Sequence, residues 1–92
     1  MLSNINKVQK NATQLGFGNV IPSSRKNKKY MINVNGKWVH FGDSRYEDFT
    51  GHGDLKRREL FRKRNAKWAT ANRGSPGYLA YHLLWQFFKI SI

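Results

Sequence analysis

The chain has 92 residues, no cysteine and a formal net charge of +12, with 17 Lys and Arg residues against five Asp and Glu residues. A chain of this length forms one domain with a small core, so we expect no deep substrate cavity, and the missing cysteines exclude disulfides, thiolate zinc sites and Cys nucleophiles. The surplus of cations predicts an anionic partner, such as nucleic acid, an acidic protein surface or an anionic membrane face.

Residues 1–28 predict an extended N-terminal arm that ends in a basic linker. The apolar residues of the first 21 positions are scattered among Asn, Gln and Gly, which is compatible with one short helix before Gly16 or with a disordered tail. No long apolar run begins the chain, so we expect no secretory signal. We assign residues 29–92 to a small, basic α+β domain.

Residues 29–41 predict a β-hairpin. Asn35-Gly36 is the strongest short hairpin signal, because a type I′ turn needs positive φ at both central positions. Closure by two residues sets the register, which pairs Val34 with Lys37, Ile32 with Val39 and Tyr30 with Phe41. Two strands alone are marginal, so a helix must cover the apolar face that these pairs form. The other face carries Met31, Asn33, Trp38 and His40.

The loop after the hairpin, residues 42–54, holds four of the five acids: Asp43, Glu47, Asp48 and Asp54. One hypothesis is a hard-metal site or a small nuclease that uses His40, His52, Asp43 and Asp54. The spacing of these residues is not diagnostic for that chemistry. We favour the alternative, a structural charge clamp in which the four acids pair with Arg45, Arg57 and neighbouring cations and cap turns.

Residues 55–68 predict a densely basic helix with Asp54 as its N-cap. Glu59 can reach Lys63 one turn further on, but most of the helix surface stays positive. Such a face can follow a phosphate backbone or meet an acidic partner. The cations are Lys56, Arg57, Arg58, Arg62, Lys63, Arg64 and Lys67. The aromatic candidates for stacking on bases are Trp38, Tyr46, Phe49 and Trp68.

Residues 76–90 predict a C-terminal helix with Ser75 as its N-cap and Pro76 at its first position. This helix is apolar nearly all round, so we expect one side to pack on the hairpin and the other to meet a partner. The candidate docking residues are Tyr81, Trp85, Phe87 and Phe88. The apolar stretch 78–92 is too short to span a membrane.

Several short motifs recur together in this chain. They are Lys-Lys-Tyr (28–30), Val-Asn-Gly (34–36), His-Phe-Gly (40–42), a run with Tyr46, Asp48, Phe49, Thr50, His52 and Asp54, an Arg-rich helix with Arg57, Arg58, Phe61 and Arg64, and Leu-Leu-Trp (83–85). This pattern resembles a family of small basic proteins of nucleocytoplasmic large DNA viruses of the phycodnavirus, mimivirus and iridovirus type. Residues 43–45 and the N-terminal arm fall outside the pattern. The resemblance implies a viral context and a virion-associated, non-enzymatic role.

Our first hypothesis is a non-enzymatic viral structural protein, a minor capsid or other virion component. It would dock on other virion proteins through its arm, its aromatic helix and its basic face, without a cofactor or a small-molecule substrate. We expect it in the virion and, during assembly, in the host cytoplasm. The alternative is a viral DNA-binding protein that coats or condenses the genome through the Arg/Lys-rich helix. Whether the basic face meets DNA, an anionic inner membrane or acidic protein stays open at this point.

Overall fold

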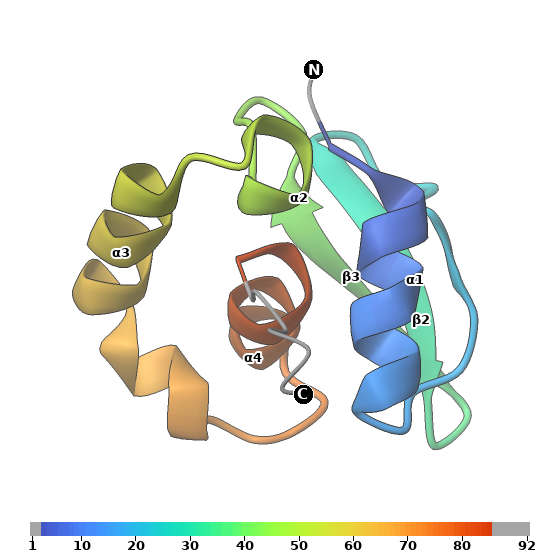
Figure 1. The fold of residues 1–92 in the computed structure, drawn as a ribbon. Coiled ribbons are helices and arrows are strands. Elements are labelled where there is room, and N and C mark those ends of the chain that lie inside the picture. Colours follow the sequence, from blue (N-terminus) through green and yellow to red (C-terminus); the bar gives the residue numbers. More distant parts are fainter. Residues whose placement is uncertain (1–2, 86–92) are drawn as a thin grey trace.

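The computed structural model describes residues 3–85 and confirms a small α+β domain. Helix α4 lies between α3 on one side and α1 with the sheet on the other (Figure 1). The elements in chain order are α1 (Ile5–Gln14), β1 (Val20–Pro22), β2 (Lys28–Val34), β3 (Lys37–Asp43), α2 (Phe49–His52), α3 (Leu55–Arg64), the 3₁₀ helix η1 (Ala66–Thr70), α4 (Pro76–Leu79) and the π-helical turn η2 (Ala80–Leu84).

The predicted hairpin and its register are confirmed. Strands β2 and β3 pair antiparallel, with Tyr30 opposite Phe41, Ile32 opposite Val39 and Val34 opposite Lys37. The turn residues Asn35 and Gly36 have φ angles of 54° and 86°, as a type I′ turn requires.

A third strand, β1, extends the hairpin into an antiparallel sheet with the order β1-β2-β3. Val20 pairs with Ile32, and Pro22 pairs with Tyr30. Proline cannot donate to a strand ladder, and an edge strand tolerates it because one side of such a strand has no neighbour. The segment that we predicted as an arm therefore contributes to the sheet.

The prediction of an extended N-terminal arm is wrong, because residues 5–14 form helix α1 against the core, which agrees with the alternative of one short helix before Gly16. The side chain of Asn4 caps the helix by accepting from the N–H groups of Asn6 and Lys7. Val8 and Ala12, one turn apart, are fully buried. Two small apolar residues give only a weak helical pattern in the sequence. The helix is stabilised by packing against the sheet and η2.

Two polar side chains of α1 join it to the rest of the domain. Asn11, itself buried, donates from Nδ2 to the carbonyl of Leu83 at 2.8 Å. Gln9 accepts from the N–H of Val20 at 2.7 Å and donates to the carbonyl of Gly18 at 3.1 Å. These bonds fix α1 against η2 and against the start of β1.

The core fills the space between the sheet, α1 and the α4–η2 segment. It contains Tyr30, Ile32 and Phe41 from the predicted apolar face of the hairpin, and Leu79, Leu83 and Leu84 from the C-terminal segment. Val34 and Val39 are only partly buried at its margin. The expectation that a C-terminal helix covers the hairpin is thus confirmed.

Both predicted long helices are shorter or more irregular than the sequence indicated. Helix α3 ends at Arg64, where Asn65 donates from Nδ2 to the carbonyl of Phe61, and the chain continues as η1. Helix α4 passes into the π-turn η2 after Leu79, and its predicted continuation over residues 86–90 lies outside the described residues. In residues 3–85, no helix is long and apolar enough to cross a membrane.

Candidate functional site

Helix α3 is joined to the rest of the protein at its two ends and along one side, and its other sides are exposed. Asp54 caps its N-terminus by accepting from the N–H groups of Lys56 and Arg57 at 3.0 and 3.2 Å, as predicted. At the other end, α3 leads into η1, which returns the chain toward α4 (Figure 1). No residue of α3 is buried. The helix is therefore an exposed arch whose sides differ in what they contact.

One side of α3 uses its cations for internal contacts. Arg58 and Arg62, one turn apart, donate to the carbonyl of Trp85 at 3.0 and 3.4 Å. The guanidinium of Arg62 also lies 4.1 Å from the ring centroid of Tyr81, and burial lowers its pKa. These two arginines hold α3 to the C-terminal segment, so the prediction that they face a partner gains no support.

A second side of α3 forms one wall of a cleft of about 790 Å³. Its residues are Arg57, Leu60, Phe61 and Arg64, spaced i, i+3, i+4, i+7 along one helical face. The opposite wall comes from the strand ends, with Lys28, Lys29, Gly42 and Asp43, and from the following loop, with Tyr46 and Glu47. The lining is completed by Asn65, Trp68, Pro76, Gly77, Ala80, Leu84 and Trp85.

Aromatic rings give this cleft a rigid wall. Phe61 stacks on Trp85 with a centroid distance of 4.3 Å and an interplanar angle of 8°, and Trp68 meets Phe61 edge to face at 6.0 Å. Gly77 allows this packing, because a Cβ at that position would lie 3.0 Å from Cγ of Trp68. Phe61 and Trp68 stay half-buried, so part of each ring faces the cleft.

The acids at the cleft mouth are already paired. Asp43 forms an ion pair with Arg45 at 2.8 Å, and hydrogen bonds from Arg45 hold the pKa of Asp43 at about 2, below the ordinary value of 3.8. Glu47 pairs with Arg57 at 3.1 Å. In residues 3–85, Lys28 and Arg64 have no carboxylate partner. The mouth of the cleft therefore carries a net positive charge.

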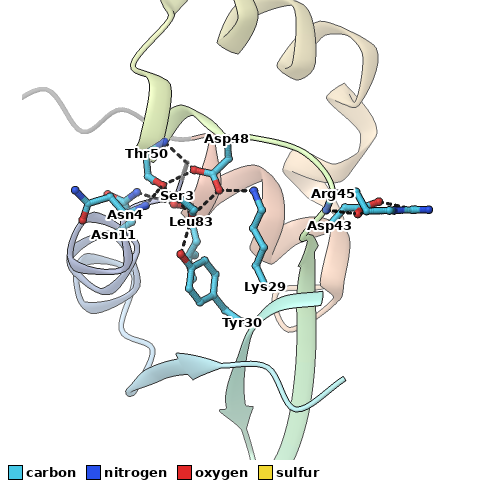
Figure 2. Close-up of polar contacts among 10 residues, drawn as sticks. All are labelled: Ser3, Asn4, Asn11, Lys29, Tyr30, Asp43, Arg45, Asp48, Thr50 and Leu83. Carbon is cyan, nitrogen blue, oxygen red and sulfur yellow. Dashed lines mark hydrogen bonds and ion pairs between the residues drawn. The ribbon is translucent and has the colours of Figure 1, made fainter. Parts of the chain in front are cut away.

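Within residues 3–85, Asp48 forms a buried polar network with residues outside α3 and does not pair with a cation of that helix (Figure 2). Its Oδ2 accepts from Lys29 Nζ and from Ser3 Oγ, each at 2.7 Å, and Ser3 in turn accepts from the hydroxyl of Tyr30. Its Oδ1 accepts from both the N–H and the hydroxyl of Thr50, so the side chain of Asp48 caps the start of α2. Burial raises the pKa of Tyr30.

The structure contains the predicted pairs of Asp43 with Arg45 and of Glu47 with Arg57, and Asp48 and Asp54 each cap a helix. Asp48 also pairs with Lys29 of β2, a cation that the predicted charge clamp did not name. The expected pair between Glu59 and Lys63 is not among the ion pairs of the described residues. Sequence spacing could not show the partner of Asp48, because Lys29 lies 19 positions before it.

The structure does not bring the predicted metal-site residues together. His40 Nδ1 bonds to Ser23 Oγ at 2.7 Å, whereas His52 Nδ1 accepts from the N–H of Asp54 at 2.9 Å. Within the part of the chain that the structure describes, no group of three or more His, Cys, Asp or Glu side chains could hold a metal ion. Burial lowers the pKa of both histidines.

The predicted docking surface on the C-terminal segment is wrong for its two described members. Tyr81 and Trp85 are 7% and 9% exposed and pack inside the domain. Phe87 and Phe88 lie outside the described residues.

Only two of the four aromatic residues predicted to stack on bases line the cleft. Phe49 is buried and Trp38 is exposed on the outer sheet face, whereas Tyr46 and Trp68 line the cleft.

One signal in the sequence could have revealed the wall of the cleft that α3 forms. It is the helical spacing i, i+3, i+4, i+7 of Arg57, Leu60, Phe61 and Arg64.

Residues 18–65 match the model of a family of unknown function, DUF5754. The match covers just over half of the chain, so the protein belongs to that family. No curated protein and no solved structure matched the chain.

Proposed function

We propose that this member of the DUF5754 family is a non-enzymatic nucleic-acid-binding protein that holds the phosphate backbone with the outward and cleft-facing cations of α3 and η1. The observation that carries the proposal is the distribution of charge on this arch. Lys56, Lys63, Arg64 and Lys67 are exposed, and none of them has an acidic partner in residues 3–85.

Their contacts in the described residues separate these four cations from the other three. Arg57, Arg58 and Arg62 contact Glu47, Trp85 and Tyr81, whereas the remaining four extend into solvent along about two helical turns and the adjoining η1. Phosphate contacts fix position and supply salt-dependent affinity without reading bases. The proposal thus accounts for the net charge of +12 without a base-reading motif.

The test is the salt dependence of binding to a labelled oligonucleotide, measured by fluorescence anisotropy. If three or four phosphates are neutralised, the slope of log K against log salt should be about −3 on duplex DNA. Lys63→Ala should weaken binding and reduce the magnitude of the slope by about one. Lys37→Ala, at the hairpin turn, is the matched control and should change neither. Weak binding with a flat salt dependence would refute the proposal.

A virion structural protein is the second candidate, and one specific feature favours it. Leu55 and Leu60 on α3 are 61% and 52% exposed, which suits contact with another protein. The viral context, the virion location and the host cytoplasm during assembly stay predictions that depend on the sequence resemblance.

Fractionation of purified particles tests this second candidate. A shell component should remain at stoichiometric amounts in capsids from which DNA has been removed. A protein that leaves with the released genome, or that occurs only in infected-cell extracts, would argue against the shell role. Release with the genome would at the same time agree with the nucleic-acid proposal.

A further inference from the structure

We propose that the cleft between α3 and the ends of β2 and β3 holds an unpaired nucleobase, so that the protein prefers single-stranded to duplex nucleic acid. This inference rests on the proposed function, because the phosphates of the same strand must be held by the cations of α3. It adds a second contact, between a base and the aromatic wall.

The size and lining of the cleft suit such a group. A volume of about 790 Å³ lies within the range of about 300–1,000 Å³ that small-molecule sites occupy. The inner lining is mainly apolar, with Phe61 and Trp68 offering ring surface and with Leu84 and Ala80 beside them. Stacking on aromatic rings accepts every base, because every base has a π-face.

The positions of the cations select a nucleotide over an uncharged apolar ligand. Arg64 lies on the α3 wall of the cleft and has no carboxylate partner in the described residues, whereas Arg57 on the same wall is paired with Glu47. Lys28 lies on the opposite wall, so positive charge flanks the aromatic surface from both sides. The acids of the mouth, Asp43 and Glu47, are held by Arg45 and Arg57 and offer little repulsion to an anion.

The mouth also carries one exposed ring that a bound base could contact. Tyr46 lines the cleft, is 65% exposed, and lies with its ring centroid 5.9 Å from the guanidinium of Arg45. A base in an intact duplex is stacked and paired, so it cannot reach these rings. A single strand offers both the phosphates and the bases, and this geometry therefore favours it.

The first measurement compares oligonucleotides on the wild-type protein at one salt concentration. We expect a thymidine strand of about 12 nucleotides to bind more tightly than a duplex of equal length, and more tightly than a strand with abasic sites. Equal affinity for the abasic strand would overturn the cleft inference while the proposed function stands. No salt-dependent binding to any of the three would overturn the proposed function as well.

The second measurement uses variants. Trp68→Leu and Tyr46→Ala should each lower the affinity for the thymidine strand by roughly five- to hundredfold, with little effect on the duplex. Trp38→Leu removes an exposed tryptophan from the outer sheet face and should change neither affinity. Tyr46 is so exposed that its variant should fold even if Trp68→Leu does not. Equal losses on both substrates would overturn the inference.

A third measurement separates a base from an acidic peptide. Binding of the thymidine strand should quench tryptophan fluorescence in the wild-type protein and in Trp38→Leu, and the quenching should be largely lost in Trp68→Leu. Polyglutamate should displace the strand only weakly. Displacement by polyglutamate at equal charge concentration would show an anion site without base contact and would overturn the inference.

Discussion

Lys29 and Asp48 form an ion pair of 2.7 Å inside the protein, with only 5% and 1% of their side-chain surfaces exposed. The pair joins β2 to the start of α2, and Ser3, Tyr30 and Thr50 complete its hydrogen bonds (Figure 2). A buried charge is stable only when its partners are all in place. Because Glu47 precedes Asp48, the same pair also positions the residue that holds Arg57 at the cleft.

Asp48→Ala should therefore destabilise the protein strongly. It leaves the ammonium of Lys29 buried without a counter-ion and removes the cap of α2, and loss of one partner of a buried pair typically costs about 3–5 kcal/mol. Urea denaturation measures the loss. Glu47→Ala breaks a pair whose members are 37% and 48% exposed, so it should cost less than about 1 kcal/mol. Similar losses in the two variants would contradict this account of the buried pair.

Alanine substitutions at three glycines should destabilise the protein to different degrees, because the glycines differ in φ and in the space for a Cβ. Gly42 has a φ of +81°, and an added Cβ would lie 2.8 Å from Leu84 Cδ1 and 3.2 Å from Lys29 Cβ. Gly42→Ala should thus cost more than the roughly 1–2 kcal/mol of a left-handed non-glycine residue.

Two further glycines provide controls for Gly42. Gly36→Ala, with a φ of +86° and open space around it, should show the conformational cost alone. Gly18→Ala has neither problem and should be close to neutral. Thermal unfolding of the three variants gives the order, and a Gly42→Ala protein as stable as the Gly18→Ala protein would refute it.

Val8→Ala tests whether α1 belongs to the core. The side chain of Val8 is fully buried, so its truncation should cost about 2–3 kcal/mol through lost burial and the remaining cavity. Ile5→Ala on the same helix removes a side chain that is 37% exposed and should cost clearly less. A Val8→Ala protein with wild-type stability in urea would mean that α1 adds little to the folded state.

Stability should fall as the pH drops below about 6.5. Burial lowers the pKa of His40 and of His52 below the ordinary value of 6.5, with Arg25 and Lys28 adding to the effect at His40 and Arg57 at His52. Above that value both histidines are neutral in the folded and the unfolded chain, and stability is complete. Below it the unfolded chain binds protons first, so the free energy of unfolding decreases until the folded protein is protonated too.

Urea denaturation at a series of pH values measures this effect. His52→Gln should show a shallower decrease than the wild-type protein, because the glutamine can still accept from the N–H of Asp54 but does not titrate. His40→Gln should act in the same direction. An unchanged pH dependence in both variants would show that other groups cause it.

Much of the fold followed from local patterns in the sequence. Asn35-Gly36 and the alternating strand residues predicted the hairpin register, and Asp54 and Ser75 act as the predicted helix caps. Each of these signals acts over a few residues. The sequence offered a short helix before Gly16 only as one of two alternatives, because only Val8 and Ala12 of the residues of α1 enter the hydrophobic core. The buried positions of Tyr81 and Trp85 were missed because an all-apolar helix does not reveal which side is covered.

The candidate site was predictable only in outline. The cations of residues 56–67 were identified, but the sequence could not separate Arg58 and Arg62, which bind the carbonyl of Trp85, from Lys63 and Arg64, which stay without acidic partners in the described part of the chain. The partner that decides their role is a backbone atom more than 20 positions away. The cleft was not foreseen, because its two walls come from segments that meet only in the folded chain.

The sequence by itself determined the hairpin, the helix caps and the net charge of +12, because turn conformation, capping and charge count are properties of adjacent residues. The tertiary structure alone decided that Asp48 pairs with Lys29, that α1 closes the core, and that Arg57 and Arg64 face an aromatic cleft. These outcomes depend on contacts between distant segments, where several partners of equal chemistry compete and packing selects one of them.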